Sequence, residues 1–154
     1  MTRQNLHSDR WDGDYDDERR RRQMFWRPNG ARMGATLYEL APGAPETRMH
    51  MHFGAEELFF VLAGTPRFRT PGGEETLAPG DVIPCPEGRA GAHTFSNPTD
   101  EPVRLLAISA GSFPDVVAYP EHGYAWVATR DPDPEALAKG GDPGIIARFD
   151  IPIE

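Results

Sequence analysis

The sequence predicts an all-β protein, built as a sandwich or a barrel of short strands. With 16 glycines and 16 prolines among 154 residues, the chain has the composition of a protein with many turns. Strand-like segments separated by turn signals recur at nearly regular spacing from residue 35 onward. No internal repeat or long helical pattern interrupts them. At this length, one domain around one core is the simplest organisation.

Composition and charge limit the possible partners. The formal net charge of −8 disfavours binding to nucleic acid and to anionic membrane surfaces. The single cysteine, Cys85, excludes an internal disulfide framework and agrees with a reducing compartment. The first 22 residues hold no signal-peptide-like apolar stretch, and no apolar run reaches the roughly 18 residues of a membrane span. We therefore expect a cytoplasmic protein without nucleic-acid or membrane partners.

Residues 1–30 are expected to form a polar N-terminal extension. Acids come first and are followed by four arginines, residues 19–22. Three acids each precede an arginine by four residues, a spacing that supports a short helical turn: Asp16/Arg20, Asp17/Arg21 and Glu18/Arg22. The arginines form either an anion or nucleic-acid patch or a solvated, self-neutralised segment, and the nearby acids favour the second interpretation. The segment could also lie against a partner subunit.

The first predicted strands follow in order. Residues 35–40 form a strand that ends at an Ala-Pro-Gly turn signal, and residues 48–52 alternate polar side chains with methionine at the period of a strand. Residues 57–62 are almost continuously apolar, which is typical of a buried strand. Residues 67–70 end at a Pro-Gly-Gly turn.

Further strands are predicted at residues 75–77, 81–83, 92–96 and 103–109, the last of them strongly apolar. Turns separate these segments, among them an Ala-Pro-Gly sequence before the second. Together they complete a core at residues 35–110.

The remainder of the chain is less regular. Residues 115–119 could add a strand, and residues 145–149 could return to a sheet edge. Residues 133–140 begin with an N-cap and a proline and stop at a glycine, so we expect a helix of about two turns. We interpret residues 31–154 as one barrel domain with a C-terminal extension.

Three histidines and a glutamate form a candidate metal site. His50 and His52 are two residues apart on a predicted strand, so both side chains leave the same face. Glu57 begins the next strand, and His93 follows two more turns, where a closed or doubled sheet can bring it opposite. This mixed nitrogen and oxygen set suits Fe, Mn, Ni, Co, Cu or Zn better than Ca or Mg. On a six-coordinate metal, it would leave two positions for water, dioxygen or a chelating substrate.

The spacing of these residues carries a family resemblance. The first half reads Gly43-x6-His50-x-His52-x4-Glu57-x6-Gly64, and the second reads Gly80-x5-Pro86-x-Gly88-x4-His93-x3-Asn97. The two halves resemble the two motifs of the cupin superfamily over roughly residues 35–110. One extra residue precedes His50, and about two extra residues precede His93, relative to the shortest pattern. Residues 113–120 look like the corresponding segment of single-domain bacterial cupins of undefined function.

The resemblance implies a cupin-type double-stranded β-helix, or jelly-roll, barrel that binds a divalent transition metal. It implies His50, His52, Glu57 and His93 as ligands. It places Gly64, Gly80 and Gly88 at turns and gives Asn97 a structural role. Glu57 is preferred to Glu56 because its distance to Gly64 matches the motif, whereas Glu56 would point to the other face. The resemblance also implies a homodimer.

Four further residues are candidates for substrate binding. Arg48 shares the strand parity of His50 and could hold a substrate carboxylate inside the barrel, although a place at the rim or in a surface ion pair is the commoner alternative. Phe59, Val61 and Phe95 share parity with Glu57 or His93, so we expect them to line the cavity, to pack in the core, or both.

The remaining reactive side chains are given no catalytic role. Cys85 has no partner in the sequence that would activate it, so we expect a buried, inert thiol. His122 could lie near the barrel mouth, but we interpret it as a loop histidine, and His7 lies in the polar leader. The sequence also lacks a phosphate loop, a dinucleotide fingerprint, a nucleophile elbow and a paired-cysteine zinc signature.

Two functions remain open. The first is a metal-dependent enzyme acting on a small molecule inside the barrel, of the dioxygenase, decarboxylase or isomerase type. An oxidoreductase is preferred because the predicted ligand set leaves adjacent positions open. The second is a non-catalytic module that binds a sugar or another small molecule, because a cupin fold alone does not define a function.

Overall fold

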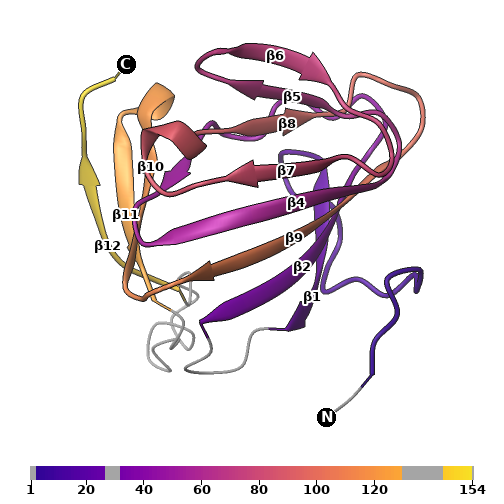
Figure 1. Ribbon diagram of the computed structural model, residues 1–154, viewed down its shortest axis with the longest axis horizontal. Coiled ribbons are helices and arrows are strands. Elements are labelled where there is room, and N and C mark those ends of the chain that lie inside the picture. The colour runs from indigo at the N-terminus through magenta and orange to yellow at the C-terminus, as the bar shows by residue number, and fades with distance from the viewer. Residues whose placement is uncertain (1–2, 27–31, 130–143, 154) are drawn as a thin grey trace.

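The computed structural model describes residues 3–26, 32–129 and 144–153, and it is built almost entirely of β-strands (Figure 1). Two single-turn 3-10 helices, η1 (Arg89–Gly91) and η2 (Pro120–His122), are the only helical elements among these residues. The strands are β1 (Arg20–Trp26), β2 (Met33–Leu40), β3 (Met51–His52), β4 (Ala55–Ala63), β5 (Arg67–Thr70), β6 (Gly73–Thr76), β7 (Val82–Cys85), β8 (Thr94–Ser96), β9 (Val103–Gly111), β10 (Asp115–Tyr119), β11 (Tyr124–Ala128) and β12 (Ile145–Asp150).

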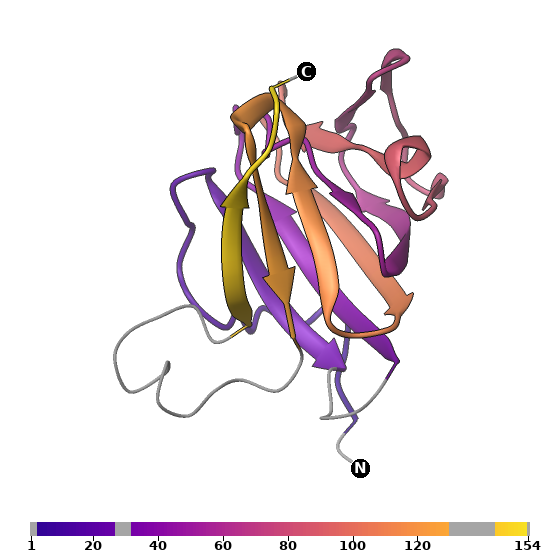
Figure 2. The same ribbon diagram turned by 90° about the vertical axis from the view of Figure 1, so that its left-hand side faces the viewer.

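The strands form antiparallel sheets that enclose a barrel. A five-stranded sheet has the order β1-β2-β9-β4-β7. Two smaller sheets have the orders β12-β11-β10-β3 and β6-β5-β8, and a backbone bridge between His50 and His93 joins their neighbouring segments. Figures 1 and 2 show the group β10–β12 at one end of the long strands and the group β5, β6 and β8 above them. The predicted all-β jelly-roll architecture is therefore confirmed.

The core lies between the five-stranded sheet and the smaller sheets. Side chains on β4 alternate, and those of Glu57, Phe59 and Val61 share the inner face. The main cluster of buried apolar residues fills the barrel on the side of His93 that faces the core: Leu40, Ala44, Phe59, Val61, Phe68, Leu77, Ile83, Cys85, Phe95, Val103, Leu105 and Ala107. One half of the barrel is thus packed with apolar side chains, which leaves the other half to polar groups.

The three glycines of the motif lie at turns, and the asparagine of the motif connects neighbouring backbone segments through hydrogen bonds. Gly64, Gly80 and Gly88 all have positive φ angles, as expected at turns. Gly64 is also held against β9, where an added Cβ would lie 2.7 Å from the Val103 side chain. The fully buried Asn97 donates from its side-chain amide to the carbonyls of Leu40, Ala41 and Glu101. Asn97 thereby satisfies backbone groups at the end of β2, a structural role.

The N-terminal segment differs from its sequence prediction. Asp16 and Arg20 do form the expected ion pair at 3.2 Å, but the predicted helical turn is wrong from Arg20 onward, where β1 begins. β1 pairs along its length with β2, and this ladder satisfies backbone groups that a single helical turn would leave open. Arg21 consequently turns away from Asp17 and binds Glu39 on the outer face of the sheet.

Glu39 fixes this segment to the barrel. Its carboxylate is only 2% exposed and accepts hydrogen bonds from Tyr15 Oη at 2.6 Å, Arg21 Nε at 2.8 Å and Arg104 Nε at 2.7 Å. The Trp11 ring packs against the guanidinium groups of Arg21 and Arg104. One buried carboxylate therefore connects the N-terminal loop, β1, β2 and β9.

The end of the chain is only partly as predicted. The strands expected at residues 115–119 and 145–149 are present as β10 and β12, whereas β11 between them was not predicted. The helix predicted at residues 133–140 lies outside the described residues. Within the described ranges, none of the helices has the length and apolar character needed to span a membrane.

Replacing Glu39 should destabilise the fold. In Glu39→Gln, the guanidinium groups of Arg21 and Arg104 lose their charged partner, so we expect the free energy of unfolding at pH 7 to fall by about 2–4 kcal/mol, as measured by urea denaturation. Glu75→Gln, on the exposed strand β6, removes the same charge and is the matched control. Equal stability of the two variants would contradict this assignment.

The same carboxylate predicts a dependence on pH. Burial raises the pKa of Glu39, but the hydrogen bonds from Tyr15, Arg104 and Arg21 lower it more, so its net pKa is below the usual value. Such a group stabilises the folded state above its unfolded pKa of about 4.3 and loses this contribution as the pH falls through the folded value. The stability difference between wild type and Glu39→Gln should therefore shrink on acidification below about pH 4.

Candidate metal centre

The backbone brings the three motif histidines to one side of the cavity. His50 and His93 exchange two backbone hydrogen bonds, His50 N to His93 O at 3.1 Å and His93 N to His50 O at 3.0 Å. His52 lies in β3 opposite Val117 of β10. Because directly opposed residues of antiparallel strands share a face, His50 and His93 both point inward, and His52 follows by strand parity.

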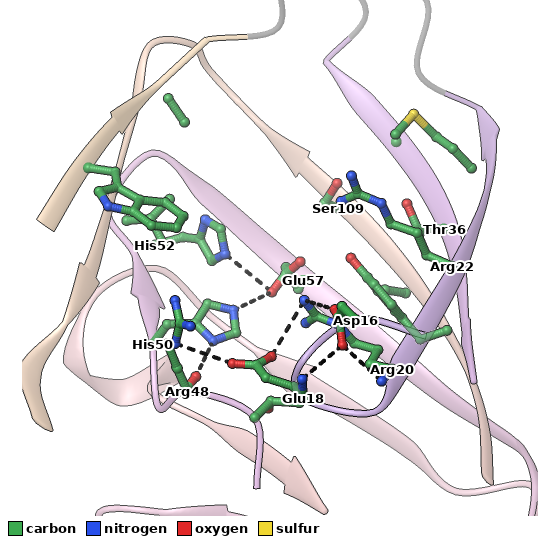
Figure 3. A pocket seen from close by; sticks show the side chains of 18 of the residues that line it. Asp16, Glu18, Arg20, Arg22, Thr36, Arg48, His50, His52, Glu57 and Ser109 are labelled. Atoms are coloured by element: carbon green, nitrogen blue, oxygen red, sulfur yellow. Dashed lines mark hydrogen bonds and ion pairs between the residues drawn. The ribbon is translucent and has the colours of Figure 1, made fainter. Parts of the chain in front are cut away.

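The imidazoles of His50 and His52 face Glu57 at the start of β4 (Figure 3), and that of His93 also approaches this carboxylate. Glu57 Oε2 lies 3.4 Å from His52 Nε2, 3.6 Å from His93 Nε2 and 4.0 Å from His50 Nε2. The ligand atoms of His50, His52 and Glu57 all lie within 4.8 Å of one another, and His93 joins this group through Glu57. The four predicted ligands are therefore neighbours, and Glu56 is exposed on the opposite face of β4.

The other ring nitrogen of each histidine already has a partner. His50 Nδ1 donates to the backbone carbonyl of Arg48 at 3.0 Å, and His93 Nδ1 donates to the backbone carbonyl of Gly91 at 2.8 Å. His52 Nδ1 donates to Asp115 Oδ2 at 2.5 Å. Carbonyl and carboxylate oxygens only accept, so Nδ1 carries the proton and the lone pair is left on Nε2. This arrangement is common around metal-binding histidines.

Burial sets the charge of the imidazoles. Burial and the neighbouring His93 and His52 lower the pKa of His50 well below its usual range. Burial also lowers the pKa of His93, and the opposing effect of Glu57 is smaller. For His52, burial lowers the pKa but Asp115 and Glu57 raise it more, so the net shift is upward. His50 and His93 are therefore neutral at pH 7, the form in which imidazole binds a metal.

Two buried polar atoms at the centre lack a partner. Among the described residues, Glu57 Oε2 and His93 Nε2 are fully buried and accept or donate no hydrogen bond. Leaving such groups unsatisfied is costly, and a bound cation would satisfy both at once. The donor set of imidazole nitrogens and one carboxylate thus fits a divalent transition metal.

A cavity of about 780 Å³ opens from this cluster toward solvent. Its walls come from the loop and strand at residues 12–24, from β2 and β9, and from β10 and β11. Tyr119 and Trp126 supply aromatic surface, and the Tyr119 ring stacks on His50 at a centroid distance of 5.8 Å. The site can therefore hold a small organic molecule beside the metal-ligating atoms.

The four predicted substrate-binding residues differ in whether they line the large cavity, the small hollow or neither. Arg48 lines the large cavity but pairs with Glu18 at 3.4 Å and donates to Tyr124 Oη at 3.3 Å, so it takes the rim position that we weighed as its alternative. Phe59 and Phe95 line a second hollow of about 60 Å³ beside His93 and also pack in the core. Val61 is buried in the core and lines neither space.

Sequence reasoning missed several residues of the site. Asp115 holds His52 and also accepts the backbone N–H of Gly54 at 2.8 Å, and its only signal in the sequence was a lone acid at the start of an apolar strand. Arg20 and Arg22 reach the cavity from β1, which the sequence did not predict as a strand. Tyr119 lay within a predicted strand, but its face could not be assigned.

Cys85 and the two remaining histidines have the places expected for them. The Cys85 thiol is buried opposite Glu57 on β7. His122 and His7 are exposed, and neither lines the cavity. None of the three contributes a ligand atom to the cluster around Glu57.

Comparison with known proteins identifies the family. Residues 36–109 match the family model of the cupin domain. Residues 36–109 are therefore a cupin domain. No curated protein sequence matches this cupin.

Solved structures support the same fold. A protein from Acidithiobacillus ferrooxidans, provisionally described as a sugar phosphate isomerase, is 31% identical over 64% of this chain and 62% of its own, with a TM-score of 0.58. The match thus spans less than two thirds of that relative. A sugar phosphate isomerase of the cupin superfamily from Silicibacter pomeroyi is 22% identical over 88% of this chain and 81% of its own, with a TM-score of 0.69.

A third solved structure has another described activity. The polyketide cyclase from Streptomyces resistomycificus is 24% identical over 71% of this chain and 79% of its own, with a TM-score of 0.58. At this level of identity, the similarity is one of fold alone.

Replacing Asp115 should weaken metal binding without removing a ligand. In Asp115→Asn, the side chain no longer holds the Nδ1 proton of His52 with a negative charge, so we expect metal affinity to fall about 10–100-fold. Competition with a coloured chelator measures this affinity. Asp150→Asn, on the exposed strand β12, is the control, and equal affinities of the two variants would contradict the positioning role of Asp115.

The Cys85 thiol should be inert in the folded protein. Burial, with a smaller contribution from Glu57, raises the pKa of Cys85 to about 12. Thiolate is the reactive form, so its share at pH 8 should be roughly three orders of magnitude below that of a free cysteine. Iodoacetamide labelling followed by mass spectrometry should modify Cys85 only after unfolding in urea. Rapid labelling of the native protein would contradict this.

Proposed function

We propose that this cupin is a metal-dependent enzyme that acts on a small molecule bound inside the barrel. The observation that carries the proposal is the orientation of the three imidazoles. Each Nδ1 is occupied by an acceptor, each Nε2 faces Glu57, and the buried Glu57 Oε2 and His93 Nε2 lack any other partner among the described residues. A site of this kind is preorganised for a cation.

His50, His52 and Glu57 would hold the metal, with His93 as the fourth ligand. A divalent Fe, Mn, Ni, Co, Cu or Zn ion would supply Lewis-acid chemistry there, and with a redox-active metal it could also support oxidation. The chain's own residues hold this site in place: Asp115 orients His52, and the aromatic rings of Phe59 and Phe95 pack against His93.

The described activities of the relatives suggest a general class of substrate but do not define one reaction. Two relatives are described as sugar phosphate isomerases, one of them provisionally, and a third as a polyketide cyclase. The two relatives below 25% identity support the fold alone, so only the first relative, at 31% identity, favours a sugar-derived small molecule as the substrate. A dioxygenase or another oxidoreductase is an alternative for the same ligand set. The cytoplasmic location and the homodimer stay predictions from the sequence.

A non-catalytic small-molecule or sugar-binding module is the second candidate. One observation favours it: apart from the proposed ligand Glu57, two carboxylates that line the cavity, Glu18 and Asp115, are already engaged by arginine and by His52. Neither is free to act as a general acid or base in this arrangement. A ligand that binds tightly and stays unchanged during long incubation with metal and oxygen would support this second function.

Metal content provides the first test. Protein purified without added metal or chelator should contain about one transition-metal ion per chain, and His50→Ala/His52→Ala should lose it, because half of the proposed ligands are gone. Elemental analysis by mass spectrometry measures both. His7→Ala/His122→Ala removes two exposed histidines and is the matched control. A wild-type protein that carries no metal and takes up none when offered would overturn the proposal.

A further inference from the structure

The cavity contains one arginine, Arg22, whose charge is not neutralised by any of the described residues. Arg20 pairs with Asp16 and Glu18, and Arg48 pairs with Glu18 and Asp17. Arg21 turns to the other face and binds Glu39. Arg22, in contrast, lines the cavity, and its guanidinium has no ion pair or hydrogen bond to the described residues.

Two hydroxyl groups lie on the same wall as Arg22. Thr36 on β2 and Ser109 on β9 line the cavity, and neither hydroxyl has a hydrogen-bond partner among the described residues. Figure 3 shows the side chains of Arg22, Thr36 and Ser109 together, on the far side of Glu57 from His52. A cation and two hydroxyl donors thus face one space, and none of the three has a partner in the part of the chain that the structure describes.

This group adjoins the candidate metal centre. Ser109 lies directly opposite Glu57 in the pairing of β9 with β4, and neighbouring strands are separated by about 4.8 Å. Directly opposed side chains share a face, so the Ser109 hydroxyl and the Glu57 carboxylate open into the same cavity. One small ligand can therefore contact both groups.

The acids of the cavity do not cancel the charge of Arg22. Asp16, Asp17 and Glu18 face Arg20 and Arg48, while Asp12 accepts the backbone N–H of Met24 at 2.7 Å. Asp14 is exposed in the loop before β1. On the wall formed by β1, β2, β9 and β4, Glu57 is the only carboxylate among the described lining residues.

We propose that Arg22, Thr36 and Ser109 form a subsite for the oxyanion of a small ligand, either a carboxylate or a phosphate group. Arginine binds both groups through two parallel hydrogen bonds, and hydroxyl donors complete such sites. The other end of the same ligand reaches the metal, a part of the assignment that rests on the proposed function. The substrate class is therefore an organic acid or a phosphate ester.

Calorimetric titration of the full chain tests the subsite. Protein loaded with Co²⁺ is titrated with inorganic phosphate in one arm and with acetate in the other. We expect wild type to bind at least one probe and Arg22→Gln to bind it about tenfold or more weakly, because a charge-assisted contact is lost. Arg22→Lys should retain part of the affinity through its charge. Preference for phosphate indicates a phosphate ester, and preference for acetate indicates an organic acid.

Arg67→Gln is the matched control, because Arg67 lies outside the cavity, pairs only with Glu74 and carries the same charge. It should bind within about twofold of wild type, since a distant exposed charge is screened by salt. Thr36→Val/Ser109→Ala removes only hydroxyl groups and should also weaken binding, and it replaces Arg22→Gln if that variant does not fold. Circular dichroism checks the folding of each variant.

The outcomes separate the subsite from the metal function. Binding of neither probe by wild type, or equal affinities of Arg22→Gln and Arg67→Gln, would overturn the subsite. Repeating the phosphate and acetate titrations without metal tests whether anion binding at the subsite depends on the metal. If wild type takes up no Co²⁺ but still binds a probe through Arg22, the metal-dependent function fails and the subsite stands.

Discussion

Two backbone hydrogen bonds between His50 and His93 set the geometry on which the site depends. They join segments that lie far apart in the sequence and connect the two smaller sheets at one point. Because an antiparallel pair of this kind directs both side chains to one face, the backbone itself fixes two of the imidazoles. Glu57 then approaches from the five-stranded sheet. The cluster is thus held between the five-stranded sheet and the point where the two smaller sheets meet, and its geometry follows from the closure of the barrel.

The side chains on the two sides of the histidine cluster differ in polarity. Behind His93, the aromatic rings of Phe59, Phe68 and Phe95 pack around the imidazole. Toward the mouth, charged groups of the N-terminal loop and β1 meet the histidines. The metal-ligating atoms of the histidines and Glu57 therefore lie between an apolar core and a solvent-accessible opening. Electrostatic interactions at such a boundary are stronger than in bulk water.

Local patterns were sufficient to predict most of the barrel. Strands such as β4 and β9 have continuous apolar runs bounded by turns, and the spacing of His50, His52, Glu57 and His93 carried the resemblance to cupins. β1 was missed because four consecutive arginines hide the alternation of a strand whose two faces are both polar. Asp115 was missed because its contact with His52 is a tertiary one, created by the pairing of β3 with β10.

The first strand also changes the borders of the five-stranded sheet. β1 occupies the free edge of β2, so that edge is closed by the chain's own N-terminal segment and is not open to pairing with another molecule. The same strand supplies Arg20 and Arg22 to the cavity. A truncation that removes β1 would therefore expose the long edge of β2 to aggregation and also take Arg20 and Arg22 out of the cavity. In this cupin, the same strand, β1, covers the edge of β2 and supplies arginine side chains to the cavity.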